Sequence, residues 1–141
     1  MEYRKFGNHY VVRIEKGEEV LSKLKELCLN ENIRLGSISG LGAANEVEIG
    51  LFNTETKEYK TTVMKGMFEI TSLIGNITRK DDEVYLHCHI NFSDASLQTF
   101  GGHLVSVKIS ATSEIIVTAI DGEVNRRFSQ NIGLNLFDFS K

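Results

Sequence analysis

The sequence of 141 residues contains no proline, only two cysteines and no long uninterrupted apolar run. Without proline, glycine, asparagine and aspartate must make the turns. Cys28 and Cys88 form neither a CxxC motif nor the paired spacing of a disulfide framework, so we expect two small buried thiols. The apolar stretches are too short to span a membrane. These absences exclude a disulfide scaffold, a CxxC redox protein and a membrane-spanning protein.

The sequence also has no excess of positive charge. It contains 16 Lys and Arg and 19 Asp and Glu, which gives a net charge of −3. Such a balance does not draw a protein onto nucleic acid unless a basic stripe is local. Basic residues adjoin only in short pairs, at Arg4-Lys5, Arg79-Lys80 and Arg126-Arg127. Because isolated charges usually face solvent, we interpret these pairs as solvated turns and strand ends.

What the sequence does contain is the composition of one globular domain, with 41% hydrophobic and 25% charged residues. A chain of this length buries a sizeable core, so we expect a single domain over residues 1–141. The opening stretch, MEYRKFGNHY, lacks the apolar core of a signal peptide. We therefore expect a soluble, cytoplasmic protein.

The apolar pattern predicts one helix and many strands. The stretch EEVLSKLKELCLNEN has apolar residues at the spacing of a one-sided amphipathic helix. Most of the chain after Asn32 consists of apolar or alternating segments separated by turn residues, which is typical of strands. We predict an α+β fold in which one main helix packs on a mostly antiparallel sheet.

Three of the four histidines lie close together in this pattern. In LHCHINFSD, His87 and His89 are two residues apart on a predicted strand, so their side chains share one face while Cys88 points the other way. His103 follows Gly101-Gly102, where missing β-carbons let the backbone come close, and it opens the next predicted strand. If the two strands pair, three imidazoles can bind one zinc-like divalent transition metal.

Each of these residues also has an ordinary structural interpretation. A His-x-His pair on a strand can simply be hydrogen-bonded or at the surface. Asp94 is either a carboxylate that orients a ligating imidazole or the first residue of the SDAS loop. His9 is best interpreted as a turn or strand-edge residue outside the site.

Other chemistries fit the sequence less well. GLGAAN, residues 40–45, lacks the third glycine of a dinucleotide-binding loop, and the residues that follow it alternate like a strand where a helix is required. Cys88 faces away from any base that could activate it. No serine nucleophile elbow or phosphate-binding loop occurs.

Five segments together resemble the plant and prokaryote conserved (PPC) domain in its stand-alone prokaryotic form: VVRIEKGEEV, SISGLGAANEVEIGLFN, MFEITSLIGNI, LHCHINFSD and GGHLVSV. The resemblance covers nearly the whole chain. It implies an α+β fold assembled as a homotrimer, with a pocket near the subunit boundary lined by His87, His89 and His103. It also links the MFEITSL segment to assembly and partner contacts, which makes Glu69 an interface or pocket residue, or else a solvated carboxylate.

Members of that family are often described as predicted DNA-binding proteins. In the plant members an Arg-Gly-Arg-Pro core contacts A·T-rich DNA through the minor groove, and this sequence has no such core. Two hypotheses follow. One is a trimeric metal-binding domain whose open metal position could serve a hydrolytic or lyase-type enzyme. The other is a regulatory or DNA-associated module without catalysis.

Self-association has separate support from the sequence. Strongly apolar strands such as SEIIVTAI and LVSVKI need cover on both faces, and one amphipathic helix covers only part of one face. We therefore expect the remaining apolar surface to bind further copies of the chain.

Overall fold

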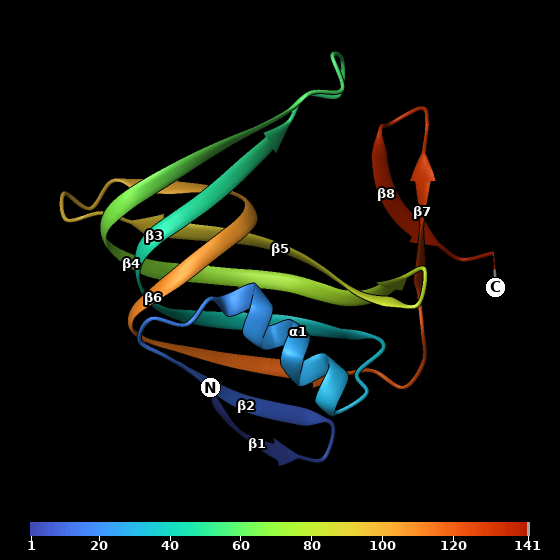
Figure 1. Cartoon of the computed structure of the whole chain (residues 1–141), viewed down its shortest axis with the longest axis horizontal. Coiled ribbons are helices and arrows are strands. Elements are labelled where there is room, and N and C mark those ends of the chain that lie inside the picture. The colour runs from blue at the N-terminus through green and yellow to red at the C-terminus, as the bar shows by residue number, and fades with distance from the viewer. Residues whose placement is uncertain (141) are drawn as a thin grey trace.

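The computed structural model describes residues 1–140 of the chain. Its elements in chain order are β1 (Glu2–Phe6), β2 (His9–Glu15), α1 (Val20–Asn30), β3 (Gly36–Phe52), β4 (Tyr59–Lys80), β5 (Glu83–Ser93), β6 (Thr99–Ala119), β7 (Asn125–Ser129) and β8 (Leu134–Asp138). Figure 1 shows α1 lying against a sheet that contains all the strands. The predicted α+β class, with one main helix on a mostly antiparallel sheet, is confirmed.

The single helix closes one side of the core. Its N-cap residue, Glu19, accepts hydrogen bonds from the backbone N–H groups of Leu21 and Ser22, which have no partner inside the helix. The side chains that α1 buries are those of the apolar stripe, Val20, Leu24, Leu27 and Cys28. Within residues 1–140, no helix is both long and apolar enough to cross a membrane.

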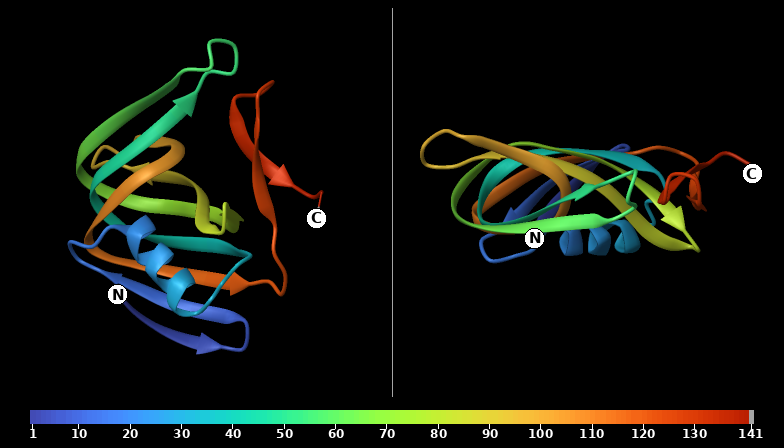
Figure 2. Two further views of the ribbon diagram at one scale, coloured as in Figure 1. Left: turned by 45° about the vertical axis from the view of Figure 1, so that its right-hand side comes forward. Right: turned by 90° about the horizontal axis from the view of Figure 1, so that it is seen from above.

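The sheet closes on itself in its central part. Strands pair in the order β1-β2-β6-β3-β4-β7-β8, and β5 pairs with both β4 and β6. Strands β3, β4, β5 and β6 therefore form a ring, which Figure 2 shows as a flattened, curled sheet with α1 along one side. All pairings are antiparallel apart from a single parallel bridge between β4 and β7. Closure removes edges that would otherwise be free to pair with other chains.

Some strands are long and bent. Strand β3 unites two segments of different pattern, the glycine-punctuated IRLGSISGLG from Gly36 on and the alternating ANEVEIGLF, and its pairing register shifts at Gly40–Gly42 and at Ala44–Glu46. A β-carbon on Gly42 would lie 2.6 Å from the carbonyl oxygen of Thr112, so the close approach of β3 and β6 requires glycine there. The bulges bend the long strands enough to close the ring.

The two faces of the sheet differ in composition. One line of paired residues points inward and is apolar: Val12, Ile115, Gly40, Leu73 and Ile90. The adjacent line points outward: Val11, Ile116, Ser39, Ile74 and His89. We call the second side the outer face. It carries both the histidines and a set of exposed apolar side chains.

Candidate metal centre

Two histidines project from the outer face of β5. In the β4–β5 ladder His87 lies opposite Asn76 and His89 lies opposite Ile74. Cys88 between them points into the core, where it is a free, buried thiol like Cys28. Burial raises the pKa of each thiol to about 12. The expectation of two inert buried thiols is confirmed, and neither can act as a thiolate at neutral pH.

The third imidazole comes from β6. His103 lies directly opposite His89 in the β5–β6 ladder. The ring centroid of His87 is 5.2 Å from that of His89 and 5.2 Å from that of His103, and the remaining pair is 5.6 Å apart. One nitrogen from each ring can be chosen so that all three lie within 4.8 Å of one another. We call these three residues the histidine triad.

The geometry of the triad fits a transition-metal ion. Tetrahedral zinc, with Zn–N bonds of about 2.0–2.1 Å, holds its nitrogens about 3.3 Å apart. A pair of nitrogens at the full 4.8 Å therefore has to approach by about 1.5 Å, a movement that side-chain torsions supply. Within residues 1–140 no hydrogen bond or ion pair holds any of the three rings, so all three are available to an ion. A three-histidine set leaves a fourth position open.

The charge state of the triad also favours a metal. Burial, followed by the nearby His103, Arg126 and His89, lowers the pKa of His87 to about 4. Burial and His89 lower the pKa of His103 below its ordinary value. Both imidazoles are therefore neutral at pH 7, which is the form that binds metals.

The triad forms the floor of a hollow of about 770 Å³ between the β3–β4 hairpin and the β7–β8 hairpin. The ring of Tyr59 meets His103 edge-on, with centroids 5.9 Å apart. Gly50 lies opposite His103 in the β3–β6 ladder, and a β-carbon there would overlap the Tyr59 hydroxyl. Gly102 also lines the hollow. Glycine at position 50 thus makes room for the aromatic wall beside the triad.

A buried arginine on β7 borders the same hollow. Arg126 is only 9% exposed, and its guanidinium donates to the Oγ1 of Thr78 (2.8 Å), to the carbonyl oxygen of Asn135 (2.9 Å) and to the Oδ1 of Asn76 (2.8 Å). The last of these is the cross-strand neighbour of His87. Burial lowers the pKa of Arg126 below its ordinary value. This arginine links the C-terminal hairpin to the strand next to the triad.

The sequence predicted that all three basic pairs lie at the surface. This prediction is wrong for Arg126 and for Arg79. Arg126 packs between the rings of Tyr85 and Phe137, each centroid 4.6 Å from its guanidinium carbon. Arg79 is 4% exposed and donates to the carbonyl oxygen of Ile33. Both pairs lie on strands, where adjacent residues face opposite sides, so one member of each pair points inward. Charge pairing along the sequence gives no signal of this difference.

The remaining predicted site residues lie elsewhere. The Asp94 carboxylate accepts hydrogen bonds from the N–H and hydroxyl of Ser96 and from the N–H of Gln98, all within the β5–β6 turn. Glu69 is exposed and lines another hollow of the outer side. Gly101 pairs with Asn91, whose side chain a β-carbon at position 101 would overlap. None of the three lines the hollow above the triad.

Comparison with known families gives one match. The family model of the Plants and Prokaryotes Conserved (PCC) domain matches residues 1–121, which include the triad and end before β7. No curated protein matches the sequence at a significant level. The resemblance inferred from the sequence motifs is therefore confirmed at the level of the family.

Solved structures extend the comparison to the whole chain. A candidate DNA-binding protein from Bacteroides thetaiotaomicron is 34% identical, with a TM-score of 0.97 over 99% of this chain and 98% of that one. A plant- and prokaryote-conserved protein from Pyrococcus horikoshii is 33% identical, with a TM-score of 0.86 over 99% and 96%. A metal-containing protein from Archaeoglobus fulgidus is 29% identical, with a TM-score of 0.88 over 96% of both chains.

Proposed function

The chain belongs to the Plants and Prokaryotes Conserved domain family, and from this premise we propose that it is a metal-binding domain. In this proposal His87, His89 and His103 hold one divalent transition metal, zinc or a zinc-like ion. The ion keeps an open position for water or a small ligand, as a hydrolytic or lyase-type reaction would require.

One observation carries this proposal. Three imidazoles from two strands offer nitrogens within 4.8 Å of one another, and no hydrogen bond or ion pair among the described residues holds them there. Histidines placed for ordinary hydrogen bonding have partners, as His9 does in the hydroxyl of Thr118. The metal content of the Archaeoglobus fulgidus relative gives independent support.

Metal analysis of the untagged full chain tests the proposal. We expect close to one transition-metal ion per chain, and less than a tenth of that in His87→Ala and in His103→Ala. His9→Ala is the matched control, because His9 is an exposed strand histidine that lies outside the triad. Metal content that is absent from the parent protein, or unchanged in both triad variants, would refute the proposal.

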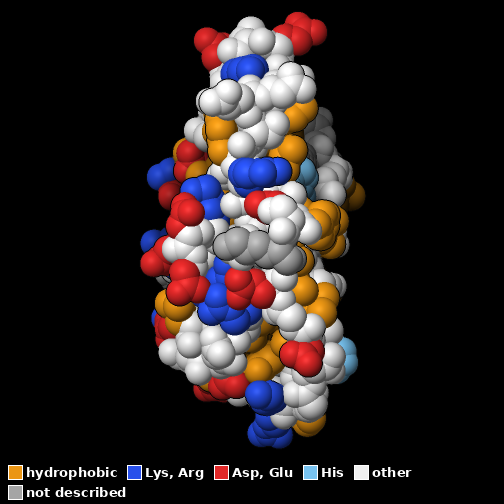
Figure 3. All heavy atoms as spheres, turned by 90° about the vertical axis from the view of Figure 1, so that its right-hand side faces the viewer, with side chains coloured by type: hydrophobic (Ala, Val, Ile, Leu, Met, Phe, Trp, Pro, Cys, Tyr) orange, Lys and Arg blue, Asp and Glu red, His pale blue; other side chains and the backbone are white. Residues whose placement is uncertain are grey.

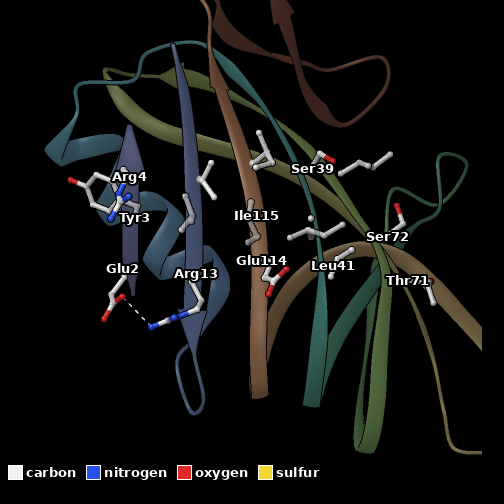
Figure 4. Close-up of a pocket in the computed structure, with 16 residues that line it drawn as sticks. Glu2, Tyr3, Arg4, Arg13, Ser39, Leu41, Thr71, Ser72, Glu114 and Ile115 are labelled. Carbon is white, nitrogen blue, oxygen red and sulfur yellow. Dashed lines mark hydrogen bonds and ion pairs between the residues drawn. The ribbon is translucent and has the colours of Figure 1, made fainter. Parts of the chain in front are cut away.

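We further propose that the chain forms a homotrimer through its outer face. A hollow of about 730 Å³ crosses β1, β2, β6, β3 and β4 on this side (Figure 4). Four apolar side chains there are 42–58% exposed: Val11, Leu41, Ile74 and Ile116. Four exposed apolar side chains on neighbouring strands favour burial of this face against another copy of the chain. Ile74 is the cross-strand neighbour of His89, so the triad would lie near the subunit boundary.

Light scattering on the full chain at micromolar concentration tests this assembly. We expect the mass of three chains for the parent protein and a lower mass for Ile74→Glu and Ile116→Glu. Leu29→Glu is the matched control, since Leu29 is 57% exposed on α1, away from this face. A monomeric parent protein would contradict the proposal.

DNA binding is a second candidate function, because the Bacteroides thetaiotaomicron relative is described as a candidate DNA-binding protein. The charge of this chain opposes it. Figure 3 shows Lys and Arg side chains intermingled with Asp and Glu on the side of the C-terminal hairpin, and the net charge is −3. Fluorescence anisotropy with an A·T-rich duplex at low and high salt tests it. Tight, salt-sensitive binding would favour this function over the metal site.

A further inference from the structure

The hollow above the triad differs in charge from the rest of the molecule. The chain has more acidic than basic residues, 19 against 16, yet among residues 1–140 no Asp or Glu lines this hollow. Its charged and titratable lining consists of the triad, Arg126 and two tyrosines. Among the described residues, the positive charge in this hollow therefore has aromatic rings beside it, those of Tyr85 and Phe137, but no carboxylate.

Arg126 is the source of that charge. It is nine-tenths buried, and its three described hydrogen bonds go to a hydroxyl, a carbonyl and an amide oxygen, all neutral. Within residues 1–140 it makes no ion pair, whereas its neighbour Arg127 lies 3.9 Å from a carboxylate oxygen of Asp138. A buried cation without a counter-charge is costly, and an anion brought by a ligand would lower that cost.

Hydrogen-bond donors remain available beside this charge. A guanidinium has five N–H groups, and the described bonds of Arg126 use three of its nitrogens once each, which leaves two N–H groups. Asn76 accepts the Arg126 bond with its Oδ1, so its own NH2 group is left to donate. A carboxylate accepts hydrogen bonds without donating any, so it complements both groups.

The walls of the hollow are apolar. Phe52 and Tyr59 come from the β3–β4 hairpin, and Leu136 and Phe137 come from β8 on the other side. A volume of about 770 Å³ lies within the range of small-molecule sites. A ligand of about ten heavy atoms with an apolar or aromatic tail would fit between these walls.

We propose that this hollow binds a small carboxylate with an apolar or aromatic tail, and that Arg126 and Asn76 hold its carboxylate beside the triad. The inference deepens the proposed metal site, because an ion on the triad adds positive charge to the same hollow. Arg126 and Asn76 act without the ion as well, so the two proposals can fail separately.

Isothermal titration calorimetry of the zinc-loaded full chain tests the ligand class. The probes are phenylacetate and phenylacetamide, which have nearly the same shape and differ in charge. We expect phenylacetate to bind at least tenfold more tightly than phenylacetamide. Equal affinity for the two compounds, or no binding of either, would overturn the proposal.

Substitutions test the assigned residues. Arg126→Gln should weaken phenylacetate binding at least tenfold and remove the preference over the amide, while Arg127→Gln, the matched control on the same strand, should change neither. Asn76→Asp places a negative charge in the hollow and should also abolish the preference. It serves as the second route if circular dichroism shows that Arg126→Gln is unfolded. Equal weakening by Arg127→Gln would overturn the proposal.

The metal-free His103→Ala variant separates this inference from the metal site. If it retains a preference for phenylacetate that still depends on Arg126, the carboxylate site stands without the ion. If the parent protein contains metal but shows no such preference, the metal site stands and the inference on its ligand is refuted.

Discussion

Hydrophobic packing accounts for the residues on the inner face of β5 but not for the histidines on its outer face. On the inner face Cys88, Ile90 and Phe92 are no more than 1% exposed, and hydrophobic packing accounts for each of them. On the outer face His87 and His89 have no hydrogen-bond partner among residues 1–140, and packing does not require an imidazole at either position. Hydrophobic packing accounts for one side of this strand, whereas the histidines on the other side lie where they could hold a metal ion.

The largest effect on folding should come from the inner face. Phe92 is fully buried and its ring lies 5.1 Å from that of Phe68. Phe92→Ala should lower the free energy of unfolding by about 3–5 kcal/mol, because it removes apolar contacts and leaves a cavity. Urea denaturation measures this loss. A loss of less than about 1 kcal/mol would show that the inner face of β5 does not form a tightly packed core.

On the outer face, a substitution should affect metal affinity strongly and folding stability little. His87→Ala should weaken metal affinity by at least about 100-fold, roughly 2.7 kcal/mol, because one of three ligands is removed. The metal-free variant should keep the stability of the metal-free parent protein within about 1 kcal/mol. Competition with a chromophoric chelator measures the affinity. A metal-free His87→Ala protein that fails to fold would place His87 with the packing residues instead.

Because His87 is partly buried, the free energy of unfolding of the metal-free protein should depend on pH. The pKa of His87 is lowered to about 4 in the folded state, whereas an unfolded histidine titrates near 6.5. As pH falls from about 6.5 towards 4, the unfolded chain takes up a proton that the folded chain does not, so stability decreases.

We expect this decrease to be about 1 kcal/mol between pH 7 and pH 5, a value discounted because the ring is only partly buried. His87→Asn should remove it, and thermal unfolding of both proteins at the two pH values measures the difference. Identical pH dependence of the two proteins would contradict the burial of this imidazole.

The smallest effect should come from the turn that follows β5. Asp94→Ala removes hydrogen bonds to Ser96 and Gln98 in an exposed loop, so we expect a loss of about 0.5–1 kcal/mol in unfolding free energy. Metal affinity should stay within about twofold of the parent protein. A tenfold fall in metal affinity would mean that Asp94 orients a triad imidazole after all.

Much of the fold could be predicted from local patterns. The 3.6-residue period predicted α1, and alternation correctly predicted that Cys88 and His87 point to opposite faces. The closure of the ring could not be predicted, because it depends on bulges in β3 and on β5 pairing with two strands at once. Such pairing joins segments that are far apart in the sequence, so local patterns do not reveal it.

The triad was accessible to sequence reasoning because its residues lie on one predicted hairpin. Arg126 and Asn76 were missed, since both are distant in sequence and their roles depend on a hydrogen bond between β4 and β7. Tyr59 was missed for the same reason, because its contact with His103 depends on the β3–β4 hairpin. The Arg126-Arg127 pair was noticed in the sequence, but charge patterning favoured a surface position for both residues.

X-ray absorption spectroscopy at the metal edge of the zinc-loaded full chain tests the central claim most directly. Convergence of the triad on one ion predicts three imidazole nitrogens at about 2.0–2.1 Å, with any further ligand a light atom. A sulfur shell at about 2.3 Å, or fewer than three imidazoles, would contradict it.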